Sequence, residues 1–181
     1  MTLSEVAKTV RIPLGFVLGI AYIWFARPTI GSLILGGGVA LIGVLVRAWA
    51  SGHIMKNDRL ATSGPYAHTR NPLYFGSFLI AAGFAAAAHW SLLVAVVAFF
   101  LIIYYPTMKR EIANIRGRFP EAYVRYASRV PLFFPRLAPW RGDPGSMNRF
   151  DPTLYMKHGE WKAGLTYVLA MIWLAFRTLR T

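Results

Sequence analysis

The sequence predicts an all-α integral membrane protein with about five transmembrane helices, interfacial amphipathic helices and a pocket on the cytoplasmic side. Residues 29–46 and 73–108 contain no Asp, Glu, Lys or Arg. The second run is long enough for two helices, because a bilayer core of about 30 Å needs about 20 apolar residues per helix. Hydrophobic residues make up 56% of the chain and occur in blocks, whereas the helices of a soluble domain usually show one-sided stripes.

The first two predicted spans cover residues 12–26 and 29–50. Trp24 lies near the end of the first span, where aromatic side chains favour the headgroup level. Three consecutive glycines, at positions 36–38, lie within the second span. We interpret them as a smooth surface for helix packing, because a dinucleotide-binding glycine motif needs a preceding strand and the sequence predicts none.

The third and fourth spans are predicted at residues 73–88 and 90–108, as a tight hairpin that turns at His89. Beyond residue 107 the chain becomes amphipathic. Pro120 disfavours helical geometry at Phe119 and suits the first turn of a new helix. We therefore expect a pair of interfacial helices that lie against the membrane.

The rest of the chain is predicted to be a loop over residues 137–162 and an apolar stretch at 163–176. The stretch is short for a span, so a fifth transmembrane helix and a helix on the membrane surface both stay open. We interpret the chain as a single membrane-embedded domain. It divides into two amino-terminal spans (1–50), a binding core (51–136) and a carboxyl-terminal part (137–181).

The net charge of +13 is unevenly distributed. Basic residues precede the first span, follow the second and cluster after the fourth, at Lys8, Arg11, Lys56, Arg59, Arg70, Lys109, Arg110, Arg116, Arg118, Arg125, Arg129, Arg136, Arg141 and Arg149. With the amino terminus in the cytoplasm, these clusters fall on one side, as the positive-inside rule expects. The distribution predicts a multi-pass protein that binds anionic lipid headgroups, and it argues against nucleic acid as a partner.

Metal and thiol chemistry find no support in the sequence. The chain has no cysteine, which excludes disulfides, thiolate metal ligands and cysteine nucleophiles. Its four histidines form no metal-binding pair at helical spacing. We therefore expect no metal site.

The polar segment at residues 60–74 is the best candidate for a binding site. Asn71 is a favourable N-cap and Pro72 a favourable first helical residue, so the third span should begin here. The start of a helix favours carboxylate or phosphate, and Arg70 beside it adds a two-pronged donor. A structural interpretation stays open, in which Asn71 and Pro72 only begin a helix and Arg70 reaches a lipid phosphate.

Other groups near this segment extend the candidate site. Gly64 and Pro65 predict a sharp turn, and Tyr66 and Tyr74 offer aromatic faces that attract cations. Glu111, at the cytoplasmic end of the fourth span, supplies a carboxylate. Together these groups suit a small molecule that carries a carboxylate, a cation and hydroxyl groups.

These residues form two separated motifs that together resemble the isoprenylcysteine carboxyl methyltransferase and phospholipid N-methyltransferase superfamily. The motifs are Gly64-Pro65-Tyr66, Arg70-Asn71-Pro72-Leu73-Tyr74 and Gly76, followed by Glu111, Phe119, Tyr123, Tyr126, Val130-Pro131 and Pro135. The resemblance covers the chain from Arg47 to about Arg136. It implies an integral membrane enzyme that binds S-adenosylmethionine and methylates a lipid-like or prenylated acceptor.

The resemblance also implies roles for individual residues. Arg70 and Glu111 are expected to be catalytic, and Arg70 is expected near the carboxylate of the cofactor or the acceptor. The expected cofactor-binding residues are His53, Gly64, Tyr66, His68, Arg70, Asn71, Pro72, Tyr74, Gly76 and Glu111. If the acceptor is an amine, Glu111 or His68 is the expected base. The loop and last helix beyond residue 137 are expected to cover the acceptor entrance.

Two departures from the family pattern matter. Ile112 follows Glu111 where family members often have a second acid, so one polar contact is missing or supplied elsewhere. Thr107 stands where prenylcysteine enzymes tend to have an Arg, which weakens a prenylcysteine substrate more than it weakens methyltransferase activity. Two other functions stay open: an NADPH enzyme similar to membrane sterol reductases, and a non-catalytic scaffold that binds anionic lipid. The acceptor, the methylated atom and the oligomeric state are not predicted.

Overall fold

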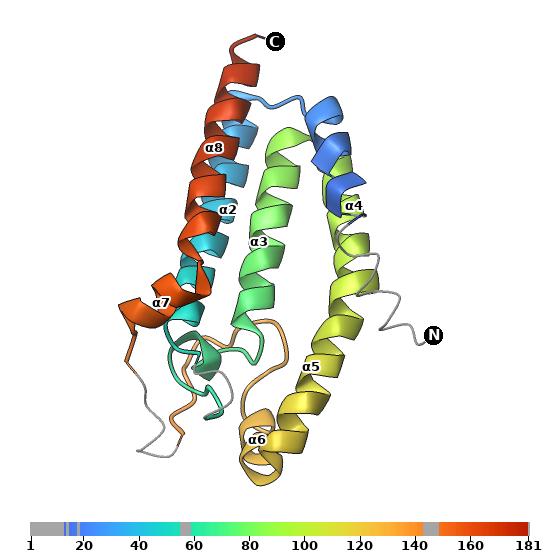
Figure 1. Ribbon diagram of the computed structural model, residues 1–181. Helices are drawn as coiled ribbons and strands as arrows, with labels where there is room; N and C mark the ends of the chain where they lie inside the picture. The colour runs from blue at the N-terminus through green and yellow to red at the C-terminus, as the bar shows by residue number, and fades with distance from the viewer. Residues whose placement is uncertain (1–12, 14, 18, 55–58, 143–148, 181) are drawn as a thin grey trace.

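The described residues of the protein form a bundle of long helices with shorter helices at one end (Figure 1). The computed structural model describes residues 13, 15–17, 19–54, 59–142 and 149–180, and every regular element among them is helical. Two of these helices, Ile30–Ser51 and Trp90–Arg118, are long and apolar enough to cross a membrane. Helices Gly15–Phe25 and Pro72–Ala88 are shorter and also apolar. The predicted all-α fold is confirmed for this part of the chain.

The first long helix is α2 (Ile30–Ser51), which matches the predicted second span closely. Thr29 caps it reciprocally: its hydroxyl accepts from the backbone N–H of Ser32, and the Ser32 hydroxyl accepts from the backbone N–H of Thr29. Residues 12, 14 and 18 of the predicted first span lie outside the described residues, as do Lys8, Arg11 and Lys56.

Helix α3 (Pro72–Ala88) packs closely against α2 because glycines face each other. A Cβ atom on Gly43 would lie 2.6 Å from the carbonyl oxygen of Gly76, and one on Gly36 would lie 2.6 Å from the backbone nitrogen of Ala87. Neither distance is possible for a real side chain, so the two backbones approach only because these positions are glycine. The predicted packing role of the glycine patch is confirmed for Gly36, whereas Gly38 is exposed.

The predicted hairpin is present, with His89 between α3 and α4 (Trp90–Phe99). His89 has extended backbone geometry, and its side chain accepts from the backbone N–H of Ser91, which caps α4. Helix α4 continues through a π-helical turn, η2 (Phe100–Tyr104), into α5 (Tyr105–Arg118).

This continuity corrects the expected pair of interfacial helices. Residues 90–118 form one helix of 29 residues, so α5 extends the fourth helix beyond the bundle (Figure 1). Pro106 does not end the helix, because the preceding π turn changes the hydrogen-bond pattern: the Tyr105 N–H bonds the Phe100 carbonyl, five residues back. The break predicted at Pro120 is confirmed, since Phe119 separates α5 from the short helix α6 (Pro120–Ala127).

A second correction concerns the predicted loop at 137–162, which contains the short helix α7 (Pro152–His158). Asp151 caps this helix by accepting from the N–H groups of Thr153 and Leu154, and Pro152 occupies its first position. Gly159 ends it in left-handed geometry, with φ of 69°.

Helix α8 (Trp161–Thr178) packs along α2 (Figure 1). At the end near the short helices, the Arg47 guanidinium donates to both Glu160 carboxylate oxygens, at 2.9 and 2.7 Å. At the other end, Arg177 donates to the carbonyl oxygens of Ile23 and Trp24, at 2.9 and 3.4 Å. Helix α8 therefore has contacts at both ends of the bundle.

Candidate functional site

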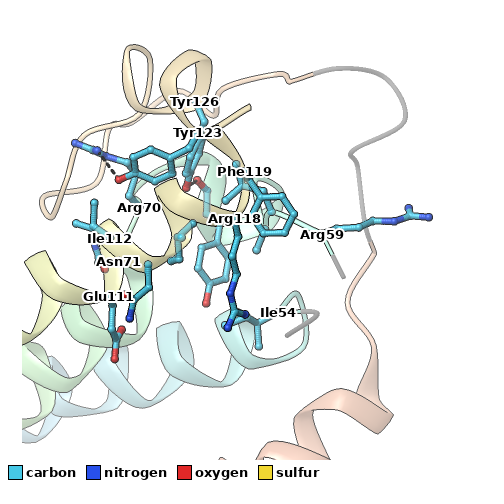
Figure 2. Close-up of a pocket in the computed structure, with 15 residues that line it drawn as sticks. Ile54, Arg59, Arg70, Asn71, Glu111, Ile112, Arg118, Phe119, Tyr123 and Tyr126 are labelled. Carbon is cyan, nitrogen blue, oxygen red and sulfur yellow. Dashed lines mark hydrogen bonds between the residues drawn. The ribbon is translucent and has the colours of Figure 1, made fainter. Parts of the chain in front are cut away.

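A cavity of about 340 Å³ lies at the end of the bundle that carries α5 and α6 (Figure 2). One wall comes from Ile54 and from residues 59–71, including the 3₁₀ turn η1 (Gly64–Ala67), and the other from α5 and α6. Among the described residues, four charged side chains line it: Arg59, Arg70, Glu111 and Arg118. Its volume is in the range of sites that bind small molecules and cofactors, which is about 300–1,000 Å³.

Gly64 shapes the loop that forms the first wall. Its φ of 58° is in the left-handed region, and a Cβ atom at this position would lie 2.6 Å from Nε2 of His53. The loop therefore folds closely over the His53 ring, and Pro65 follows as an early residue of η1. The His53 ring packs against this loop and does not line the cavity.

Hydrogen bonds join the two sequence motifs directly. The Arg70 N–H donates to the carbonyl oxygen of Pro131, and the Asn71 side-chain amide donates to that of Leu132, both at 2.9 Å. The Tyr126 hydroxyl donates to the carbonyl oxygen of Tyr66 at 2.7 Å. Segments about 60 residues apart thus hold each other in place, which explains why the motifs occur together.

Arg70 lies at the junction of these segments. One of its terminal nitrogens donates to the Tyr123 hydroxyl at 2.9 Å, while its Nε atom is buried without a partner among the described residues. A buried donor without a partner is costly, at about 1–3 kcal/mol. Arg70 therefore retains donor capacity for an anionic group beside the cavity.

Glu111 lies close to the start of α3. The Tyr74 hydroxyl donates to its Oε1 atom at 2.9 Å, and the Tyr74 ring packs edge-on against Tyr104 with centroids 5.8 Å apart. Tyr74 thus orients the carboxylate and does not itself line the cavity. The acid at the end of the fourth span and the beginning of the third span lie on opposite walls of one cavity.

Asn71 occupies the N-cap position of α3 without acting as a side-chain cap. Its amide nitrogen donates to the carbonyl oxygen of Leu132, and none of the first N–H groups of the helix donates to its side chain. Asn71 nevertheless lines the cavity together with Tyr66, Arg70 and Glu111. These four are the expected site residues that the structure brings together around the cavity.

The other expected site residues lie behind the walls. His68 bonds the carbonyl oxygen of Arg136 through Nδ1 at 2.8 Å, and Pro72 is buried as the first residue of α3. Gly76 faces α2, where a Cβ atom would lie 2.7 Å from Cγ of Arg47. Gly76 thus makes room for the arginine that pairs with Glu160.

Several lining residues were not among the expected site residues. Asn114 and Arg118 follow Glu111 on one face of α5, and Ile112, Ile115 and Phe119 form an adjacent apolar face. Asn114 lies three residues after Glu111 and Arg118 four residues after Asn114, and this helical spacing was the available signal. It was missed because this segment was expected to be an interfacial helix against the membrane, with its basic side chains available to solvent or phosphate. No described residue of 149–180 lines the cavity, so the described carboxyl-terminal helices do not cover it.

Two tyrosines of the cavity, Tyr66 and Tyr126, are neutral hydrogen-bonding groups. Burial, with a further effect from the Glu111 and Glu160 carboxylates, raises the pKa of Tyr66 above its usual range. Burial also raises the pKa of Tyr126. Both phenols therefore stay protonated at physiological pH, and the Tyr126 hydroxyl acts as a donor to Tyr66.

The cavity thus combines guanidinium donors, one oriented carboxylate, aromatic faces and an apolar wall. Among the described residues, no group of three His, Asp or Glu side chains is placed to hold a metal ion. Such a site suits an organic ligand that carries both charges.

Comparison with known proteins places the chain in a family. The profile of the phospholipid methyltransferase family matches residues 14–119, more than half of the chain. The cobalt-zinc-cadmium resistance protein CzcN of Cupriavidus metallidurans is 38% identical over 112 residues, which are 60% of this chain and 50% of CzcN. The nickel-cobalt-cadmium resistance protein NccN of Alcaligenes xylosoxydans xylosoxydans is 31% identical over 161 residues, which are 84% of this chain and 71% of NccN.

The comparison with solved structures gave no match. The aligned part of this chain spans about half the length of CzcN, and both relatives have names that refer to metal resistance. The profile match includes the loop at Gly64, the start of α3 and Glu111. By this match, the chain belongs to the phospholipid methyltransferase family.

Proposed function

We propose that the protein is an S-adenosylmethionine-dependent methyltransferase that acts on a lipid-like or prenylated acceptor in the membrane. The observation that carries this proposal is the cavity itself, where Arg70 and Asn71 at the start of α3 lie opposite Glu111 of α5. Membership of the phospholipid methyltransferase family supports the same reaction class.

The residues present fit this cofactor. Its carboxylate matches Arg70, whose buried Nε has no partner among the described residues. Its positive charges match the Glu111 carboxylate and the aromatic faces of Tyr66 and Tyr123. Its adenine matches the apolar wall of α5. When bound, the cofactor supplies an electrophilic methyl group on a positively charged sulfur.

The chain itself contributes orientation of the charged groups. Arg70 is fixed by its backbone bond to Pro131 and its side-chain bond to Tyr123, and Glu111 is oriented by Tyr74. Alignment of two reactants can supply about 7–11 kcal/mol in favourable cases. We therefore assign Arg70 and Glu111 mainly to binding and positioning of the charged groups.

We propose the following setting for the enzyme. The chain forms one domain, crosses the membrane about five times and has its cavity on the cytoplasmic side. Most basic residues of the described chain support this orientation, because Arg59, Arg70, Arg110, Arg118 and Arg125 lie on or beside the elements of the cavity end. The same residues support contact with anionic headgroups.

Calorimetric titration with S-adenosylmethionine and with its demethylated product tests this function. Wild-type protein should bind both saturably, and Arg70→Ala and Glu111→Ala should each weaken binding by about tenfold or more, since each removes a charged partner. Arg116→Ala is a matched control, because Arg116 lies exposed on α5 and does not line the cavity.

Absence of binding in both detergent and native lipid would refute the proposal. Unchanged affinity in both cavity variants would place the cofactor elsewhere. Thermal protection by NADPH and not by S-adenosylmethionine would favour the reductase alternative, and saturable binding of neither would favour the lipid-binding scaffold.

A further inference from the structure

The loop that follows α6 carries two large apolar side chains that are exposed. We call residues 131–137, Pro-Leu-Phe-Phe-Pro-Arg-Leu, the Phe134 loop. Phe134 is 72% exposed and Leu137 is 100% exposed. Single exposed apolar residues are common on protein surfaces, but these two lie three positions apart on one short loop. Their joint exposure indicates contact with an apolar partner.

Hydrogen bonds fix the Phe134 loop, so its apolar side chains are held outward. The Thr69 hydroxyl donates to the carbonyl oxygen of Phe133 at 2.8 Å, and the Arg136 N–H donates to that of His68 at 3.0 Å. Two further bonds run from the residues just before α3 to the first two carbonyl oxygens of the loop. Prolines at positions 131 and 135 have no N–H group to satisfy. An irregular segment paired in this way is suited to the edge of the hydrocarbon, where unpaired backbone groups are costly.

The contacts of Phe133 set the level of the loop along the bundle. Its ring packs against Phe78 and Phe100, with centroids 5.8 and 5.0 Å apart. Phe78 lies six residues after the first residue of α3, which is about 9 Å along the helix. Figure 1 shows the chain after α6 returning to this end of α3.

The length of α3 relates this level to the bilayer. Its 17 residues span about 26 Å, slightly less than a bilayer core of about 30 Å. Because α3 is proposed to cross the membrane, both of its ends lie close to the core boundaries, and the level of Phe78 lies inside the core. The Phe134 loop therefore lies at the boundary between headgroups and acyl chains.

The charges around the loop suit the headgroup layer. Arg129, Arg136 and Arg141 lie within or beside it, and residues 122–142 contain no Asp or Glu. Guanidinium groups bind phosphates, while the apolar side chains between them favour acyl chains. This alternation of charge and apolar surface is complementary to a phospholipid surface.

We propose that the Phe134 loop enters the bilayer leaflet next to the cavity, with Phe134 and Leu137 against the acyl chains. The loop thereby docks the cavity wall that carries Arg70 on the phospholipid surface, because the Arg70 N–H bonds the first residue of the loop. This docking does not require methyl transfer. It rests only on the proposed crossing of the membrane by α3 and its neighbours.

Nitroxide spin labels in vesicles of phosphatidylcholine and phosphatidylglycerol test the docking. The chain has no cysteine, so Phe134→Cys and Leu137→Cys each provide one site for a label. Collisions of the label with oxygen, which concentrates in hydrocarbon, are compared with collisions with a polar nickel chelate. Both labels should give a ratio of oxygen to nickel collisions about tenfold above that of a position in water, because polar solutes are excluded from hydrocarbon.

Two control positions define the scale. Ala122 is exposed on α6, which Figure 1 shows farther from the bundle than the lower end of α3, so the label in Ala122→Cys should report water. Ile42 is 55% exposed in the middle of α2, so the label in Ile42→Cys should report the bilayer core.

The outcomes separate the loop from the membrane topology. A water-like ratio at Phe134 or Leu137, beside a core-like ratio at Ile42, would overturn the docking and leave the topology intact. Low collision rates with both reagents would show that protein covers the loop, and they would also overturn it. A water-like ratio at Ile42 would overturn the proposed topology and the docking together. Cofactor binding is measured separately, so its failure would overturn the proposed function alone.

Discussion

At the scale of single residues, the cavity depends on a few side chains whose roles follow from what surrounds them. Position 64 needs glycine because its backbone is left-handed and the His53 ring lies against it. Tyr74 matters because its hydroxyl donates a hydrogen bond to Glu111. The sequence singled out both residues as direct ligand contacts. Their actual positions, behind the cavity wall, depend on contacts between distant segments, which local sequence patterns do not reveal.

Gly64→Ala should destabilise the protein by roughly 1–3 kcal/mol, because alanine is strained at positive φ and its Cβ atom meets Nε2 of His53. Unfolding in mixed micelles, followed by circular dichroism, measures the change. Gly117→Ala is the control: Gly117 lies in α5 with nothing within 4 Å of its Cβ position, so alanine there should stabilise the protein by about 0.4–1 kcal/mol. Equal effects at the two positions would contradict the role given to Gly64.

Tyr74→Phe should weaken binding of the proposed cofactor, S-adenosylmethionine, by about threefold to tenfold while it leaves the helices intact. The substitution keeps the ring against Tyr104 and removes only the hydroxyl that orients Glu111. Calorimetric titration gives the affinity, and circular dichroism gives the helix content. Tyr105→Phe, at an exposed neighbour of Tyr104, should change neither value.

At the scale of elements, the starting positions of helices could be predicted where the sequence has a residue typical of a helix start. Thr29, Asn71 and His89 mark the beginnings of α2, α3 and α4, and each begins within a residue or two of its predicted position. The continuity of α4 and α5 was not predictable, because a π turn before Pro106 depends on how the surrounding helices pack. Helix α7 carries an Asp-Pro start, but its polar composition indicated a loop.

The pairing of Arg47 with Glu160 could not be predicted from the sequence either, because the two residues are 113 positions apart. The side chains are 25% and 13% exposed, so the pair is largely shielded from water. It joins the start of α8 to α2, and Arg47 also donates to the Ser77 hydroxyl on α3. Three helices therefore meet at one guanidinium beneath the cavity.

Removal of one side chain of the Arg47–Glu160 pair should therefore lower the stability of the protein. Glu160→Gln should destabilise the protein by about 3 kcal/mol, at the lower end of the range for buried pairs because both groups keep some contact with water. A double-mutant cycle with Arg47→Gln measures the coupling between the two side chains. Glu121→Gln on α6, at an exposed position, should cost less than about 0.5 kcal/mol. Additive effects of the two pair mutations would show that the ion pair contributes nothing.

At the scale of the whole molecule, the bundle has two chemically different ends. The cavity end carries α5, α6 and α7 (Figure 1). Most of the described basic residues lie in or beside these elements and the loops next to them. The opposite end is closed by contacts among apolar residues, Ala26, Ala87, Ala88 and Leu174, and by a bond from the Ser32 hydroxyl to the carbonyl oxygen of Ala87. This polarity is what a protein needs if it takes a polar cofactor from one aqueous side and an amphiphile from the bilayer.

The position of α8 bears on whether this helix crosses the membrane or lies on its surface. Its 18 residues span about 27 Å, close to the thickness of a bilayer core of about 30 Å. It follows α2 between the Arg47 pair at one end and the Arg177 bonds at the other. A helix lying on the membrane surface would not remain beside α2 over this length, so we propose that α8 crosses the membrane.

Because the sequence has no cysteine, single introduced cysteines report the topology without background. Lys162→Cys and Arg180→Cys place thiols at exposed positions near the two ends of α8. If α8 crosses, an impermeant maleimide should label Arg180→Cys in intact spheroplasts and Lys162→Cys only in inverted vesicles, since the cavity end is proposed to be cytoplasmic. Labelling of both from one side would place α8 on the surface, and the reverse pattern would invert the proposed orientation while it preserved the crossing.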